Sequence, residues 1–229
     1  MKQGMLFYEK RWSMKPAVIF DFNGTMVFDA IYHEQAWKQF AIKLRGHAFT
    51  SEEMKMMHGK PNIKIIEYLK PDCNINEAIE LSKAKEALYR DIALQDDAYQ
   101  LVHGLEAFLK ALQKEQIALN IASASIIENI EFFIQQFQLD RWFDPTKIIY
   151  DNNTYENKVA MFKDAAKQLQ VEIGNCYVFE DSLSGIQCAY EAGVKGIIVI
   201  GNHQAANQLG VIKTIDDYST INELLALLK

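Results

Sequence analysis

Short, wholly apolar runs alternate with amphipathic stretches along this 229-residue sequence. The first run is Ala17–Phe20, and further strand-like runs lie at 117–122, 147–150, 175–179 and 196–200. Apolar runs of this length are typical of strands that are buried on both faces of a sheet. Because stretches with helical periodicity separate them, the sequence predicts an α/β fold with a doubly wound parallel sheet and helices on both faces.

A long interruption follows the first strand. Between about Ala30 and Leu94 the sequence has only helical periodicity, with no strand-like run. This pattern predicts an all-helical domain inserted into the sheet domain. We therefore expect an α/β core domain made of residues 14–28 and 97–229, a helical cap domain over 29–96, and an N-terminal extension over 1–13.

Composition limits the possible partners and surroundings. The formal net charge is −6, whereas nucleic-acid binders usually carry an excess of basic residues. The three cysteines fit no metal-ligand spacing, which favours a reduced, cytoplasmic setting. No apolar run approaches the roughly 20 residues of a membrane helix. We expect a small molecule as partner, with no nucleic acid and no membrane, and a monomer or weak homodimer.

Polar side chains stand at the ends of the predicted strands. Asp21 ends the first strand, Ser123 the second, and Glu180 and Asp181 the fourth, while Lys158 begins the helix after the third. Each alone has an ordinary explanation as a turn, a helix cap or a solvated charge. In open parallel sheets, however, ligands bind beyond the carboxyl ends of the strands. The joint occurrence therefore indicates one site.

This mixture of groups suits phosphoryl transfer. A carboxylate such as Asp21 can attack phosphorus and form an aspartyl phosphate. The charge on the phosphoryl oxygens must then be met by an ammonium group and a divalent cation. Asp21 and Asp181 can supply the hard oxygen ligands that Mg²⁺ prefers, and Ser123 and Lys158 can hold the phosphate oxygens.

The same residues resemble the motifs of a known family. Residues 20–25, Phe-Asp-Phe-Asn-Gly-Thr, are similar to the first motif of the haloacid dehalogenase superfamily. Ser123, Lys158 and residues 178–193 resemble its second, third and fourth motifs, in the same order. The likeness spans nearly the whole chain from residue 16. It implies a Rossmann-like core and a helical, type-1 cap domain after the first strand.

Two further segments resemble one branch of that superfamily. The pattern His33-x-x-Ala-Trp37 and the segment Ser123-Ala124-Ser125 are similar to the β-phosphoglucomutase-like subfamily. The mutases themselves often carry a lysine after the second segment, where this chain has Ile126. The resemblance therefore favours a small sugar-phosphate phosphatase over a phosphomutase.

The resemblance also implies roles for single residues. Asp21 would be the nucleophile and a ligand of Mg²⁺, and the Asn23 carbonyl, Asp181 and Glu180 would complete the protein ligands. The expected catalytic residues are Asp21, Asn23, Thr25, Ser123 and Lys158, with Thr25 orienting the nucleophile. The expected substrate-binding residues are Gly24, His33, Lys60, Ser123, Ala124 and Lys158.

One position departs from the family. Its phosphatases and phosphomutases usually have an aspartate two residues after the nucleophile, which protonates the leaving oxygen and later activates water. Here this residue is Asn23, which cannot exchange a proton at neutral pH. This predicts a slow enzyme, a substitute proton carrier such as His33 or Glu34, or a substrate with a good leaving group.

Three functions follow from the sequence. The first is a magnesium-dependent phosphohydrolase that acts on a small phosphomonoester, with a sugar phosphate as the expected metabolite. The second is a β-phosphoglucomutase-like phosphomutase, which shares the nucleophile. The third is a catalytically weak phosphate-ligand sensor, which Asn23 suggests but the retained nucleophile Asp21 opposes.

Overall fold

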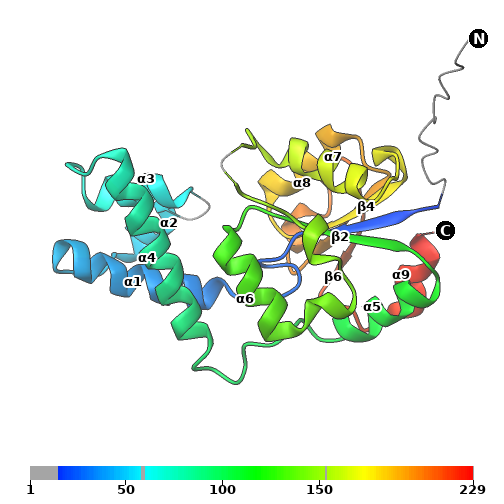
Figure 1. Ribbon diagram of the computed structural model, residues 1–229, viewed down its shortest axis with the longest axis horizontal. Helices are drawn as coiled ribbons and strands as arrows, with labels where there is room; N and C mark the ends of the chain where they lie inside the picture. The colour runs from blue at the N-terminus through cyan, green and yellow to red at the C-terminus, as the bar shows by residue number, and fades with distance from the viewer. Residues whose placement is uncertain (1–14, 58–59, 153, 229) are drawn as a thin grey trace, which may run out of the picture. The chain divides into compact units, whose positions relative to one another are not determined.

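A computed structural model of the protein describes residues 15–57, 60–152 and 154–228 (Figure 1). The expected N-terminal extension, 1–13, lies outside the described residues. The chain divides into two compact units, of which one runs to Met26 and resumes at Leu101, and the other is Val27–Gln100. We call them the sheet unit and the helical unit. The predicted domain boundaries near residues 29 and 96 stay a proposal.

The sheet unit is built on six parallel strands, which confirms the predicted α/β fold class. The sheet order is β3-β2-β1-β4-β5-β6. The strands are β1 (Ala17–Phe20), β2 (Ala118–Ser123), β3 (Ile149–Tyr150), β4 (Cys176–Glu180), β5 (Gly196–Ile200) and β6 (Val211–Ile215). The sequence did not predict β6. This edge strand is only partly buried and carries Lys213 and Thr214 in its middle, so it lacks the continuous apolar run of a central strand.

Helices cover both faces of this sheet (Figure 1). The helices of the unit are α5 (Leu105–Lys114), α6 (Ile127–Phe137), α7 (Lys158–Gln168), α8 (Leu183–Ala192) and α9 (Ile221–Leu227). Short 3₁₀ turns lie at Leu139–Arg141, Pro145–Lys147, Ile173–Asn175 and His203–Ala205. Helices α7 and α8 pack against one face, while α5 lies on the other and contacts α9.

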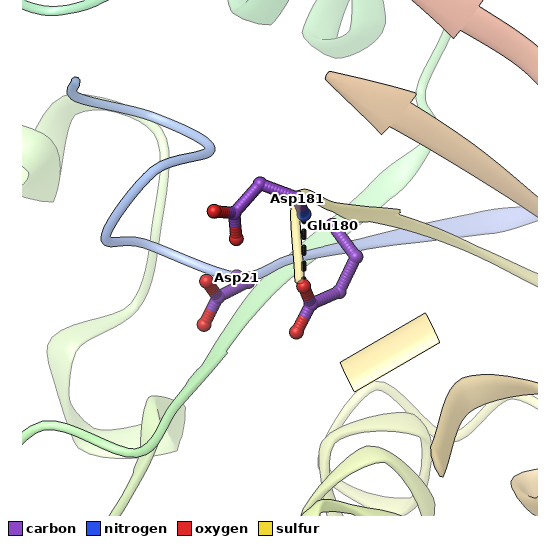
Figure 2. Close-up of side chains that lie close together, drawn as sticks. All are labelled: Asp21, Glu180 and Asp181. Carbon is purple, nitrogen blue, oxygen red and sulfur yellow. Dashed lines mark hydrogen bonds between the residues drawn. The ribbon is translucent and has the colours of Figure 1, made fainter. Parts of the chain in front are cut away.

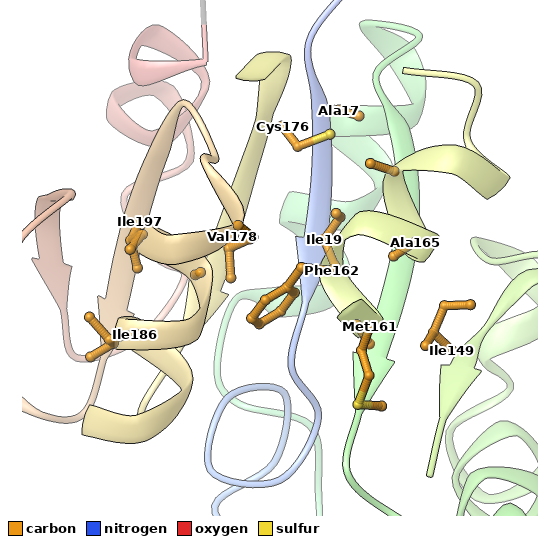
Figure 3. Packing of buried hydrophobic residues seen from close by; sticks show 14 of the residues in the cluster. Ala17, Ile19, Ile149, Met161, Phe162, Ala165, Cys176, Val178, Ile186 and Ile197 are labelled. Atoms are coloured by element: carbon orange, nitrogen blue, oxygen red, sulfur yellow. The ribbon is translucent and has the colours of Figure 1, made fainter. Parts of the chain in front are cut away.

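Successive side chains along the central strands point to opposite faces of the sheet, and each set packs against one layer of helices. Ile19 and Val178 point to the α7 and α8 side, where Phe162 of α7 packs between them (Figure 3). Their neighbours Phe20 and Phe179 point to the opposite face and stack at 4.9 Å between ring centroids. Burying one such large side chain contributes about 1.5–3 kcal/mol. The packing of both faces thus holds the carboxyl ends of β1 and β4 in fixed positions.

The described residues of the helical unit form four helices and no strand, as predicted. They are α1 (Ala30–Arg45), α2 (Ser51–Met57), α3 (Asn62–Leu69) and α4 (Ile75–Ala93). Trp37, Phe40, Ile66 and further apolar residues form its core. The described part of the chain contains no helix that is long and apolar enough to cross a membrane.

Candidate active site

Asp21 lies where the central strand of the sheet unit ends. It follows β1 directly, is buried, and its backbone N–H donates to the Phe179 carbonyl at 3.0 Å. Strands β2 and β3 lie on one side of β1, and β4, β5 and β6 lie on the other. This reversal of strand order next to β1 is where doubly wound sheets bind ligands.

Three carboxylates gather at this point. Asp21 comes from the end of β1, and Glu180 and Asp181 come from the end of β4 (Figure 2). One oxygen atom from each carboxylate lies within 4.8 Å of the other two. The three residues lie together because each follows a strand end that the parallel sheet brings to the same edge.

Lys158 connects the two strand ends. Its Nζ donates to Asp21 Oδ1 at 2.7 Å and to Glu180 Oε1 at 2.5 Å. It is the first residue of α7, and the Asn157 side chain caps that helix by accepting from the Val159 N–H. Because the cap fixes where the helix begins, it also fixes where the ammonium group enters the site.

Glu180 is held on its other oxygen. Oε2 accepts hydrogen bonds from the backbone N–H groups of Asp181 and Ser182, both at 2.8 Å, and from the Ser182 hydroxyl at 3.1 Å. Ser182 also caps α8, since its Oγ accepts from the Gly185 N–H. The Glu180 side chain is therefore fully buried but has a partner for each of its oxygens.

Burial sets the protonation of the group. It raises the pKa of Asp21 to about 7; Lys158 opposes this shift, whereas the charge of Glu180 adds to it. Burial, together with the charges of Asp21 and Glu180, raises the pKa of Asp181 to about 8. Burial disfavours the charged form of Lys158, but the two carboxylates overcome this effect and raise its pKa. The positive charge of Lys158 therefore does not fully compensate the negative charge of the buried carboxylates at neutral pH.

Two glycines leave room for these carboxylates. Gly24 has φ +77°, and a Cβ atom there would lie 2.2 Å from Asp181 Oδ2. Gly185 is in α8 with ordinary helical geometry, but its Cβ would lie 1.7 Å from Glu180 Oε1. Gly24 therefore serves both a left-handed turn and a close approach, whereas Gly185 serves the close approach alone.

Hydroxyl and amide groups form the other side of the site. Ser123 is buried at the end of β2, and its Oγ accepts from the Ser125 N–H at 3.3 Å. The Ser125 hydroxyl donates to Asn23 Oδ1 at 2.6 Å. The Thr25 hydroxyl is buried and has no hydrogen-bond partner among the described residues, so its expected role in orienting Asp21 stays a prediction.

Two neighbours of the site were missing from the sequence prediction. Asn202 donates from its side chain to the Asp181 carbonyl at 2.8 Å, and Tyr218 donates its hydroxyl to the Thr25 carbonyl at 3.1 Å. Asn202 follows β5, so the strand-end argument could have found it. Tyr218 lies before α9, where no pattern in the sequence distinguishes it.

The remaining predicted residues are Ala124 of the sheet unit and two residues of the helical unit. Ala124 is exposed in the loop after β2, within the sheet unit. His33 and Lys60 belong to the helical unit, where Lys60 is exposed. His33 stacks on Tyr89 at 3.8 Å and its Nδ1 lies 2.7 Å from Lys85 Nζ. Their predicted contacts with substrate remain proposals.

The carboxylate group fits a hard divalent cation. It offers closely spaced oxygen ligands, the donor type that Mg²⁺ prefers. The raised pKa values of Asp21 and Asp181 show that the site favours added positive charge, and a bound cation would supply it. Asp21 and Asp181 could hold it, since Glu180 already accepts from Lys158 and three further donors.

The close approach at Gly185 yields a test of this geometry. Glycine to alanine inside a helix normally stabilises it by about 0.5–1 kcal/mol. Here we expect Gly185→Ala to destabilise the protein by about 1–3 kcal/mol, because the methyl group overlaps Glu180. Urea unfolding measures the change, and Ser184→Ala, at an exposed position of the same helix, is the control. A stabilised Gly185→Ala protein would contradict the described packing.

The fold and the site together define a class of enzyme. Residues 18–199 match the family model described as haloacid dehalogenase-like hydrolase, which covers more than half of the chain. The chain therefore belongs to the haloacid dehalogenase-like hydrolases, and the family resemblance of the sequence is confirmed.

Known proteins are similar to this chain in sequence or in fold. A crystal structure of a HAD hydrolase, family IA, variant 3, from Entamoeba histolytica HM-1:IMSS is 34% identical, with a TM-score of 0.86 over 93% of this chain and 99% of that one. The 6-phosphogluconate phosphatase of Escherichia coli (strain K12) is 25% identical over 188 residues, which are 78% of this chain and 80% of that protein. A crystal structure of β-phosphoglucomutase from Clostridium difficile has the same fold, with 21% identity and a TM-score of 0.72 over 94% and 97% of the two chains.

Proposed function

We propose that this protein is a magnesium-dependent phosphohydrolase that acts on a small phosphomonoester through an aspartyl phosphate on Asp21. The observation that carries the proposal is that Asp21 accepts a hydrogen bond from the ammonium group of Lys158 and lies close to the carboxylate of Asp181. The ammonium group can stabilise the negative phosphoryl oxygens during attack by Asp21. Bound Mg²⁺ would neutralise charge that develops on these oxygens.

In the proposed reaction, residues of the sheet unit attack the phosphoryl group and bind its oxygens. Asp21 attacks phosphorus through a carboxylate oxygen, and the bond from phosphorus to the leaving oxygen breaks. Lys158 remains bonded to Glu180 and can turn an N–H toward the transferring group, while the Ser123 hydroxyl can donate to it. Water then attacks phosphorus, the bond to Asp21 breaks, and inorganic phosphate leaves.

A sugar phosphate is the proposed substrate class. A 25% identical relative carries the name 6-phosphogluconate phosphatase, and the helical unit offers His33 and Lys60 as polar groups that could contact a sugar. A phosphomutase would share the step on Asp21 and differ only in the acceptor. The phosphomutase is kept as the alternative because the segment Ser123–Ser125 resembles the β-phosphoglucomutase-like subfamily, which contains both kinds of enzyme.

The test is phosphate release from a panel of sugar phosphates and one aryl phosphate. We expect release with Mg²⁺ and its loss on adding a chelator, with recovery when Mg²⁺ is restored. Conversion of one sugar phosphate to its isomer without release would instead identify a phosphomutase. Binding of phosphate compounds without any turnover would identify a sensor. Undiminished release with chelator present would refute the metal assignment.

A further inference from the structure

Both polar groups of the Asp181 backbone are bonded to side chains. Its N–H donates to Glu180 Oε2 at 2.8 Å (Figure 2), and its carbonyl accepts from the Asn202 side chain at 2.8 Å. The hydrogen-bond ladder of α8 begins one residue later, with the bond from the Ile186 N–H to the Ser182 carbonyl. Asn202 therefore fixes the backbone from which the Asp181 carboxylate extends.

Asn202 makes this long-range bond instead of a local one. It stands directly before the 3₁₀ turn His203–Ala205, where an asparagine side chain usually accepts a hydrogen bond from the turn that follows. Here the side chain makes no such capping bond with the described residues. Its amide nitrogen reaches from the end of β5 to the end of β4, so the bond ties together two neighbouring strand ends.

Tyr218 supports a second segment of the site in a similar way. Its hydroxyl donates to the Thr25 carbonyl at 3.1 Å, and its backbone N–H donates to the His103 carbonyl at 2.9 Å. The ring is fully buried and packs against Phe108 and Phe179. Because the ring cannot turn without disturbing this packing, its hydroxyl is a fixed support for the turn that contains Thr25.

The two supported segments touch each other at Gly24 and Asp181. A Cβ atom on Gly24 would lie 2.2 Å from Asp181 Oδ2, and Thr25 is the next residue of that turn. Burial, and then the charges of Asp21 and Asp181, raise the pKa of Tyr218 well above its usual range, so the hydroxyl keeps the proton that it donates. Movement of either segment would change the spacing of the Asp21 and Asp181 oxygens.

We propose that Asn202 and Tyr218 are positioning residues of the metal site, an inference that rests on the Mg²⁺ site of the proposed function. Each acts through a main-chain carbonyl and not as a ligand. Together they hold the segments that carry Asp21 and Asp181, so that the carboxylate oxygens are spaced for a cation before it binds. Residues that orient the ligands of a metal in this way raise its affinity.

The experiment is isothermal titration calorimetry with Mg²⁺ in the absence of substrate. Asn202→Ala and Tyr218→Phe each remove one bond and are expected to weaken Mg²⁺ binding by about 10-fold, since residues that only orient a ligand cost about 10–100-fold when changed. Turnover is expected to recover at saturating Mg²⁺, because the ligands and the nucleophile are retained. The matched controls are Asn207→Ala, at an exposed position, and Tyr177→Phe, a buried tyrosine near the amino end of β4. Both are expected to bind Mg²⁺ as the native protein does.

Urea unfolding of the metal-free variants separates positioning from a purely structural role. Both are expected to stay folded, since Tyr218→Phe keeps the ring and Asn202 is only partly buried. Unchanged Mg²⁺ affinity in either variant, whatever its stability, would overturn the assignment of that residue and leave the proposed function intact. A native protein that binds Mg²⁺ but releases no phosphate would overturn the proposed function alone, whereas one that binds no Mg²⁺ would overturn both.

Discussion

Asp21→Asn is expected to lower phosphate release by about 10⁴-fold or more, since an amide oxygen cannot act as the nucleophile. The fold is expected to survive, because the substitution keeps the shape of the side chain and Lys158 retains its bond to Glu180. Beryllium fluoride in the presence of Mg²⁺ is expected to form an adduct on Asp21 in the native protein and none in the variant. Asp140→Asn, an exposed position with the same change of charge, serves as the control.

The stability of the metal-free protein provides an independent measurement on the same variant. The pKa of Asp21 is raised to about 7 in the folded chain, from about 4 for an ordinary aspartate. A raised carboxylate pKa means that the folded state binds the proton more tightly, so stability is full below about pH 4 and declines as pH rises toward 7. We expect Asp21→Asn to reduce this decline, as followed by urea unfolding between pH 4 and 8. An unchanged pH profile would show that the pKa of Asp21 is not raised in the folded chain. An adduct on another side chain would show that Asp21 is not the nucleophile.

The strand-end residues could be predicted from the sequence for a physical reason. Asp21, Glu180 and Asp181 each follow an apolar run, and parallel pairing of β1 with β4 places these ends side by side whatever the details of packing. Lys158 was predictable in the same way, since a helix that follows a strand begins at the same edge of the sheet. The strand β6 was not, because an edge strand carries too little apolar sequence to be distinguished from a loop.

Contacts made by side chains from distant loops were beyond such reasoning. The bond from Ser125 to Asn23 joins residues 102 positions apart, and the bond from Tyr218 to Thr25 joins residues 193 apart. Neither pair shares a periodic pattern, so only the folded chain reveals them. The sequence likewise placed Gly24 in the site, but a reason for glycine there, the approach of Asp181, depends on the position of β4.

Asp181→Asn is expected to weaken Mg²⁺ binding by at least about 100-fold, because even residues that only orient a metal ligand cost about 10–100-fold when they are changed. The variant removes one of three closely spaced carboxylates and leaves the backbone bonds of Asp181 and Glu180 in place. Isothermal titration calorimetry without substrate measures the affinity, and turnover is expected to recover in part at high Mg²⁺. Asp140→Asn is again the control.

The pH dependence of that affinity identifies which carboxylate binds the ion. Mg²⁺ binds the deprotonated form, so its apparent affinity for the native protein is expected to rise with pH until both Asp21, with a pKa of about 7, and Asp181, with a pKa of about 8, have lost their protons. Of these two carboxylates only Asp21 remains to titrate in Asp181→Asn. Because Asp181 has the higher pKa, we expect the affinity of the variant to level off about one pH unit lower than that of the native protein. A variant that binds Mg²⁺ as tightly as the native protein, with the same pH dependence, would show that the ion lies elsewhere in the chain.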